Sequence, residues 1–278
     1  MAIELGKFNQ LEIIKEVDFG LYLDGGEEGN ILLPSRYVPY NYEIGQKIDV
    51  FIYLDNEERL VATTLMPYVQ VGEFAYLQVS WVNQYGAFLD WGLMKDLFCP
   101  FREQKRKMEV GRSYIIHAHV DPDSFRIMAS SKVEKYLSTE RPPYAPDDEV
   151  DLLIWQHTNM GYKVIIDNKY QGLVYENQVF RELEIGDRLK GFIMQVREDG
   201  KVDVALQRSG RQQTLDFADT LLNYMEHNGG RCFLHDKSPA EEIYERFKVS
   251  KKVFKKAVGD LYKRRLIEIT DHGLQLIN

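Results

Sequence analysis

The 278-residue sequence is poor in cysteine, with only Cys99 and Cys232. Two cysteines in different predicted domains argue against a disulfide framework and indicate a reducing compartment. The sequence has no apolar stretch as long as a membrane span, and its N-terminus has no basic segment followed by an apolar one, as a secretory signal would have. We therefore expect a cytoplasmic protein that does not bind membranes.

The sequence also lacks the motifs of common catalytic sites. It has no glycine-rich phosphate-binding loop, no GxSxG motif and no spaced carboxylate set of the kind that nucleases use with magnesium. His117 and His119 alternate along a predicted strand, but no third ligand lies nearby, so we interpret them as structural histidines. These absences predict a non-enzymatic binding protein without a cofactor or a metal.

Pairs of glycines recur along the chain at one spacing. In each pair the two glycines are 25 residues apart: Gly20 and Gly45, Gly86 and Gly111, Gly161 and Gly186. Alternating apolar residues follow each second glycine, and after a polar turn a further strand begins with a basic residue: Arg59, Arg126 or Lys201. The chain therefore carries three copies of one small β unit.

Each β unit is predicted to form a small barrel. In the first unit, strands are predicted at 10–17, 20–23, 31–33, 47–54 and 59–64, and five short strands with turns at such intervals indicate a closed or nearly closed barrel. The third unit begins after the proline-rich segment 141–146, which opposes both helix and central strand. The predicted domains are residues 1–66, 67–140, 141–213 and 214–278.

The C-terminal domain has a different pattern from the three β units. Apolar residues at helical spacing predict helices over 214–228, 238–247 and 251–265, with Ser238 and Ser250 as N-caps of the second and third. Two short strands around residues 271–273 predict a hairpin. Three helices and a hairpin make a winged helix-turn-helix, so the chain is expected to be mainly β with a C-terminal α+β domain.

Charge is distributed unevenly along the chain. The net charge is −8, yet the segment from Arg246 to Arg265 holds nine Lys or Arg and one acid. The lysines predicted on the face opposite the buried stripe of the third helix are Lys252, Lys255, Lys256 and Lys263. A run of charge is often only a solvated surface, but its concentration in an acidic chain favours contact with nucleic acid.

The second β unit resembles a known domain. The segments Tyr85–Asp90, Leu97–Pro100, Val110–Gly111 and Arg126–Ile127 are similar to the S1 RNA-binding domain, a five-stranded OB barrel. The resemblance covers the whole second unit, is fair in the first and is weaker in the third, where Met160 and Lys163 stand at the usual aromatic positions. Three such units followed by a winged helix resemble the bacterial conserved virulence factor B family, which implies a role in post-transcriptional control of virulence genes.

The resemblance and the residue patterns together predict single-stranded RNA as the partner. Exposed aromatic residues would stack on bases and basic residues would hold phosphates, although the aromatic rings could instead complete a barrel core or a contact between domains. The predicted RNA-binding residues are Phe19, Tyr22, Arg59, Tyr85, Phe88, Arg126, Lys163, Lys169, Tyr175, Lys201, Arg208, Arg211, Lys252, Lys255, Lys256 and Lys263.

Two other functions stay open at this point. A DNA-binding regulator would place the lysine-rich helix in a major groove. An adaptor would use the acidic barrels to dock a protein such as a ribosomal component, because acidic barrels repel phosphates at long range.

Overall fold

The computed structural model describes residues 2–176, 179, 182–208, 210–247, 249–270 and 273–277, with the side chains of 210–213 and 216 left out. Backbone contacts divide the chain into two compact units, one of residues 1–142, 150–190 and 197–202 and the other of residues 143–149, 191–196 and 203–278. No helix in the described residues is long and apolar enough to cross a membrane.

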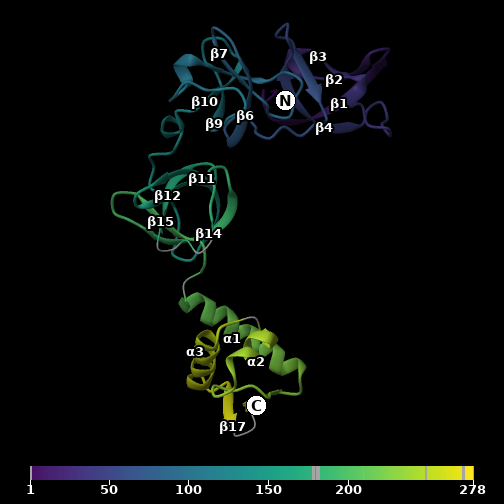
Figure 1. Cartoon of the computed structure of the whole chain (residues 1–278). Helices are drawn as coiled ribbons and strands as arrows, with labels where there is room; N and C mark the ends of the chain where they lie inside the picture. Colours follow the sequence, from purple (N-terminus) through teal and green to yellow (C-terminus); the bar gives the residue numbers. More distant parts are fainter. Residues whose placement is uncertain are drawn as a thin grey trace. The chain divides into compact units, whose positions relative to one another are not determined.

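The first barrel closes through five strands (Figure 1). They are β1 (Phe8–Val17), β2 (Gly20–Asp24), β3 (Asn30–Pro34), β4 (Lys47–Leu54) and β5 (Leu60–Thr63), in the order β1-β2-β3-β5-β4. Alternating side chains point inward and bury Ile13, Leu23 and Val50 completely, as the period of two along a strand requires. The strands lie within a few residues of the predicted ones.

The second and third barrels repeat this topology. The second consists of β6 (Phe74–Val82), β7 (Gly86–Leu89), β8 (Leu97–Pro100), β9 (Ser113–Val120) and β10 (Ile127–Ser130). The third consists of β11 (Glu149–Thr158), β12 (Gly161–Ile166), β13 (Tyr170–Tyr175), β14 (Arg188–Val196) and β15 (Val202–Ala205). The prediction of three closed five-stranded barrels is confirmed.

The first glycine of each repeated pair begins the second strand of its barrel. A side chain there would collide with the neighbouring strand, because an added Cβ would lie 2.1 Å from the Leu33 carbonyl oxygen at Gly20 and 2.3 Å from that of Cys99 at Gly86. The second glycine lies in the turn before the fourth strand, with φ of 80° at Gly111, and its N–H donates to the Val79 carbonyl at 2.9 Å. The 25-residue spacing therefore joins two backbone requirements that only glycine meets well.

The C-terminal domain is the predicted winged helix-turn-helix. Its elements are α1 (Gly210–His227), β16 (Arg231–Cys232), α2 (Ala240–Phe247), α3 (Lys251–Lys263), β17 (Ile267–Thr270) and β18 (Gly273–Leu276). The Ser250 hydroxyl accepts the Val253 N–H at 3.3 Å, so the predicted N-cap of α3 is confirmed. Ser238 differs from its prediction, because its hydroxyl accepts the His235 N–H at 3.0 Å and α2 begins two residues later.

Candidate nucleic-acid interface

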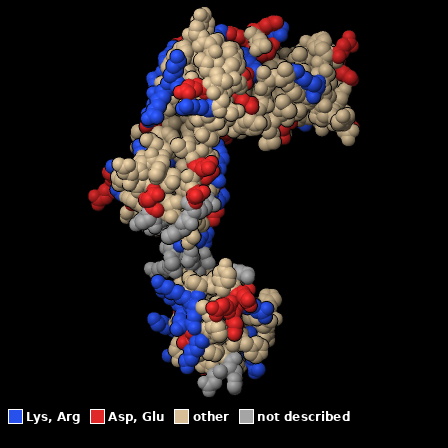
Figure 2. Space-filling view, in the orientation of Figure 1, with Lys and Arg blue, Asp and Glu red and all other residues tan. Residues whose placement is uncertain are grey.

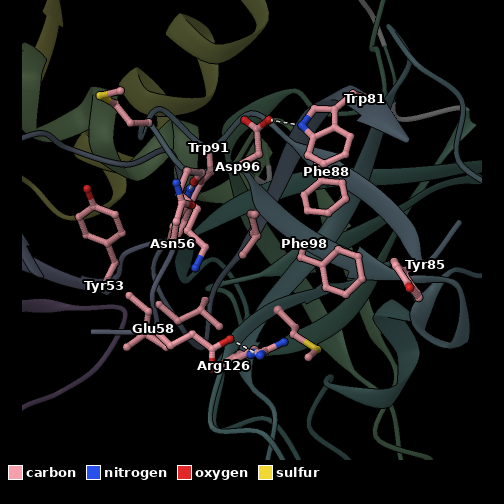
Figure 3. Close-up of a pocket in the computed structure, with 16 residues that line it drawn as sticks. Tyr53, Asn56, Glu58, Trp81, Tyr85, Phe88, Trp91, Asp96, Phe98 and Arg126 are labelled. Carbon is pink, nitrogen blue, oxygen red and sulfur yellow. Dashed lines mark hydrogen bonds and ion pairs between the residues drawn. The ribbon is translucent and has the colours of Figure 1, made fainter. Parts of the chain in front are cut away.

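Three aromatic rings line up across neighbouring strands of the second barrel. The strand register pairs Trp81 of β6 with Phe88 of β7, and Phe88 with Phe98 of β8. The rings of Trp81 and Phe88 are parallel, with centroids 3.7 Å apart, and those of Phe88 and Phe98 are 4.9 Å apart (Figure 3). We call these three residues the aromatic face.

Trp81 occupies its place for two reasons. A β-bulge between Val79 and Trp81 shifts the register of β6 against β7, and a bulge re-aims the side chains of the bulged strand. The indole N–H also donates to the Asp96 carboxylate at 2.9 Å, which fixes the orientation of the ring. Trp81 is 45% exposed although one side of its ring lies against Phe88. The ring therefore offers a flat surface to a ligand.

Of the predicted stacking residues in this barrel, Phe88 lies at the centre of the aromatic face. Tyr85 lies beside the face on the turn before β7 and is 65% exposed (Figure 3). The sequence prediction missed Trp81 and Phe98, which lie on the strands flanking Phe88. For Phe98, pairing the expected strands across the sheet was the available signal, because an aromatic residue opposite Phe88 shares its side of the sheet.

The aromatic face borders a cavity of about 740 Å³. Its lining residues come from the first two barrels, and Figure 3 shows Tyr53 and Glu58 of the first barrel opposite the rings of the second. Arg126 forms an ion pair with Glu58. Apolar walls with a few polar groups at the rim are typical of a site for a flat ligand such as a nucleobase.

Lys95 joins the two barrels at this cavity. Its ammonium group donates to the Asp55 carbonyl at 2.6 Å. Burial lowers the pKa of this lysine, because the charged form is penalised away from water. The first barrel therefore provides a fixed wall of the cavity.

The equivalent positions in the other barrels carry different residues. In the first barrel the register aligns Lys15, Tyr22 and Leu32, and in the third it aligns Gln156, Lys163 and Leu173. The predicted pair Phe19 and Tyr22 is in edge contact at 6.2 Å, and Lys15 lies 5.2 Å from the Tyr22 ring. A row of three aromatic rings is therefore found in the second barrel and not in its two repeats.

The basic residues predicted at the head of the last strand of each barrel are ion-paired. The pairs are Arg59 with Asp55 and Glu57 at 2.8 Å each, Arg126 with Glu58, and Lys201 with Asp199 at 2.7 Å. A phosphate at these positions would have to compete with a carboxylate already in contact. Such exposed pairs contribute only about 0–1 kcal/mol each, but they reduce the positive charge that the barrels offer.

The predicted basic residues of the third barrel are also engaged. Lys169 pairs with Glu140 at 3.4 Å, Arg208 pairs with Glu149 at 3.7 Å, and Lys163 lies 5.3 Å from the Trp155 ring. The Tyr175 hydroxyl accepts a hydrogen bond from the Arg197 guanidinium. Arg211 lies outside the side chains that the structure describes.

The lysines of α3 differ from those of the barrels. Phe254, Ala257, Val258 and Leu261 are buried in the core of the domain, and the four predicted lysines of this helix are exposed on its other face. In the described part of the chain, no carboxylate lies within 4.0 Å of any of these four ammonium groups. Figure 2 shows basic side chains gathered on the helical domain. This helix therefore offers unpaired positive charge.

Comparison with known proteins finds two matching family models. The S1 domain model matches residues 5–65, and the model of the CvfB-like winged helix domain matches residues 219–276. The Bacillus subtilis protein YitL is 29% identical over 260 residues, which cover 91% of this chain and 87% of YitL. Conserved virulence factor B of Staphylococcus aureus is 22% identical over 234 residues, which cover 82% of this chain and 78% of the relative. Along most of its length the chain is thus similar to YitL and to conserved virulence factor B.

One solved structure matches nearly the whole length of this chain. It is a multidomain protein with nucleic acid binding domains from Streptococcus pneumoniae, 24% identical, covering 98% of both chains with a TM-score of 0.42. The S1 match falls on the first barrel, whose strand order the other two barrels share. The S1 and winged-helix matches are to domains of the nucleic-acid-binding type.

Two groups that the sequence singled out are buried in the second barrel. His117 is 8% exposed and stacks on Tyr136, with ring centroids 4.1 Å apart, and burial lowers its pKa to about 4. Burial also raises the pKa of the Cys99 thiol to about 12, so this cysteine is a protonated core residue. Among the described residues, no group of three His, Cys, Asp or Glu side chains is placed to hold a metal ion.

Proposed function

We propose that this protein binds single-stranded RNA without catalysing a reaction, and that bases stack on the aromatic face of the second barrel. The observation that carries the proposal is the row formed by Trp81, Phe88 and Phe98 beside a cavity of about 740 Å³. Stacking contributes about 1–3 kcal/mol per base and depends little on sequence, because every base has a flat face. Tyr85, exposed beside the face, offers a further ring.

The lysines of α3 supply phosphate contacts in this proposal. They are exposed and unpaired among the described residues, whereas the basic residues that head the last strands of the barrels are paired. Each phosphate neutralised on a single strand steepens the fall of log K with log salt by about 0.7. Four contacts from α3 would therefore contribute a slope of about 3.

We extend the proposal to a role in post-transcriptional regulation in the cytoplasm. Its support is the name of the staphylococcal relatives, conserved virulence factor B, together with the RNA-binding chemistry of the aromatic face. A binding protein without sequence preference fits such a role when its target is an unstructured stretch of a transcript.

The test is a fluorescence-anisotropy titration of a labelled single-stranded RNA with the full chain. Replacing Tyr85→Ala and Phe88→Ala together should weaken binding by about tenfold or more, because two stacking rings are lost. Tyr40→Ala with Phe233→Ala is the matched control, since both rings are exposed outside the proposed site. Equal affinity of the folded Tyr85/Phe88 variant and the control would remove the second barrel from the site.

Duplex DNA is a second candidate ligand, favoured by the unpaired lysines of α3. In winged helix-turn-helix domains the corresponding helix commonly enters a major groove. A duplex of equal length, titrated beside the RNA, distinguishes the two ligands. Tighter binding of the duplex, with no effect of Tyr85→Ala and Phe88→Ala, would favour the DNA-binding function.

A further inference from the structure

A group of basic side chains lies on the second barrel outside the site described above. It comes from residues 102–107, between β8 and β9, and residues 132–135, after β10. These segments hold six Lys or Arg and two Glu in a chain with a net charge of −8. We call this group the basic patch, and its basic members are Arg102, Lys105, Arg106, Lys107, Lys132 and Lys135. Figure 2 shows basic side chains gathered over the second barrel.

Hydrogen bonds hold the two segments of the basic patch together. The Lys105 N–H donates to the Ser131 hydroxyl at 2.8 Å, and the Ser131 N–H donates to the Glu103 carbonyl at 2.9 Å. The Lys132 ammonium donates to the Arg102 carbonyl at 2.5 Å. The backbone that carries the positive charges is therefore fixed before any ligand arrives, which limits the entropy lost on binding.

Only half of the positive charge in the patch is neutralised by nearby acids. The ion pairs are Lys105 with Glu134, Lys135 with Glu103, and Arg102 with Asp121. Arg106, Lys107 and Lys132 are exposed, and none of them has a carboxylate within 4.0 Å in the part of the chain that the structure describes. These three side chains can donate hydrogen bonds to phosphates without first breaking an ion pair.

The patch is continuous with the aromatic face. Phe98 lies in β8, and β8 leads directly through Phe101 into Arg102. The Phe101 N–H donates to the Tyr85 carbonyl at 3.2 Å, and Phe101 is 41% exposed. The chain therefore runs from the aromatic face through an exposed aromatic residue into the basic patch.

We propose that the basic patch binds the sugar-phosphate backbone of the same single strand whose bases stack on the aromatic face. This inference rests on the proposed function. An OB barrel contacts about 4–16 nucleotides, which is more than three rings can stack, so the strand continues past the face. The patch is the positive surface that it meets next along Phe101, whereas Arg59 and Arg126, expected to hold phosphates, are paired with acids.

The test removes the three unpaired charges from the full chain by Arg106→Gln, Lys107→Gln and Lys132→Gln. The matched control makes the same change in net charge elsewhere on the first two barrels, by Lys7→Gln, Lys47→Gln and Arg112→Gln. Both are titrated with a fluorescein-labelled single-stranded RNA of about 16 nucleotides over a range of salt. The patch variant should lower the slope of log K against log salt by about 2, at about 0.7 per lost phosphate contact, and weaken binding about tenfold. The control should leave the slope nearly unchanged.

The remaining outcomes separate this inference from the proposed function. If the patch variant matches its control while Tyr85→Ala with Phe88→Ala still weakens binding, the inference is wrong and the proposed function stands. If the patch variant loses binding to duplex DNA but keeps its affinity for single-stranded RNA, the single-strand assignment of the patch is wrong. If the unmodified chain does not bind RNA at moderate salt, the proposed function and the inference about the basic patch are both wrong.

Discussion

The first and second barrels share a backbone plan but not a surface. Both close in the same strand order, begin their second strand at a glycine pressed against a neighbouring backbone, and carry a β-bulge in their first strand. At the three aligned positions the first barrel has Lys15, Tyr22 and Leu32, and the second has Trp81, Phe88 and Phe98.

Different residues of these barrels determine the fold and the binding of a ligand. The glycines and the inward-facing apolar residues recur in all three repeats, so they specify the barrel. The outward-facing residues on the first three strands are free to change, because they contribute little to the core. We therefore expect substitutions of the shared glycines to destabilise every barrel alike, whereas truncating the aligned surface residues to alanine should weaken binding in the second barrel alone.

The largest expected effect comes from the shared glycines. Gly86→Ala should destabilise the protein by about 3 kcal/mol, because the new methyl group would meet the Cys99 carbonyl and force the two strands apart. Gly20→Ala should lower the free energy of unfolding at least as much. In addition to the close contact, φ at Gly20 is 150°, which a residue with a side chain rarely adopts. Chemical denaturation measures both, and Gly111→Ala, with open space around its Cβ, should cost less. A loss below about 1 kcal/mol for Gly86→Ala would contradict the shared plan.

The next effect concerns His117, whose equivalent in the first barrel is Phe51. Each side chain stands opposite a phenylalanine of the first strand, Phe74 or Phe8. The pKa of His117 is lowered from 6.5 to about 4 by burial and by the neighbouring His119. Between these two pKa values the unfolded chain binds more protons than the folded one, so stability falls as the pH drops.

As the pH falls from about 7.5 to about 5, the titration of His117 should therefore lower the free energy of unfolding by about 2 kcal/mol. Replacing it by the residue of the first barrel, His117→Phe, should remove most of this loss. Urea denaturation of both proteins at the two pH values measures the difference. An equal loss in the variant would assign the pH dependence to other groups.

A smaller effect should follow from copying the aromatic face onto the first barrel. Lys15→Trp with Leu32→Phe would place rings on both sides of Tyr22. The affinity for single-stranded RNA should rise by about 1 kcal/mol, because one more base gains a stacking surface. Lys15→Ala with Leu32→Ala is the control in the same anisotropy assay. If the affinity does not exceed that of this control, the backbone of the first barrel does not present such a face to RNA.

The smallest effect is expected from the ion-paired basic residues at the start of the last strand of each barrel. Arg59→Gln with Lys201→Gln should change RNA affinity by less than about 0.5 kcal/mol, because both charges are already neutralised by acids. The four lysines of α3, replaced by glutamine in the same way, should give a much larger loss and a shallower salt slope. Equal losses would mean that phosphates displace the carboxylates.

Much of the fold could be predicted from the sequence because it depends on local requirements. The glycine spacing reports two backbone positions in each barrel, and the alternating apolar residues report which side of each strand is buried. Of the two predicted N-caps, Ser250 is confirmed and Ser238 is wrong, because Ser238 closes a turn to His235 instead of capping α2.

The candidate site could be predicted only in part, because it depends on contacts between strands and between barrels. Tyr85 and Phe88 stood out beside a glycine, but Trp81 joins them through a bulge that the sequence does not reveal. The pairing of Arg126 with Glu58 is also invisible in the sequence, since it forms between two barrels.

The most direct test of the aromatic face uses intrinsic tryptophan fluorescence. Of the three tryptophans, Trp81 is 45% exposed, whereas Trp91 and Trp155 are 3% and 8% exposed. Titration with unlabelled single-stranded RNA should quench the emission of the full chain, since a stacked base contacts Trp81. The Trp81→Phe variant should keep binding by anisotropy but lose most of the quenching. Equal quenching in this variant, or no quenching of the unmodified chain when RNA is bound, would contradict the account.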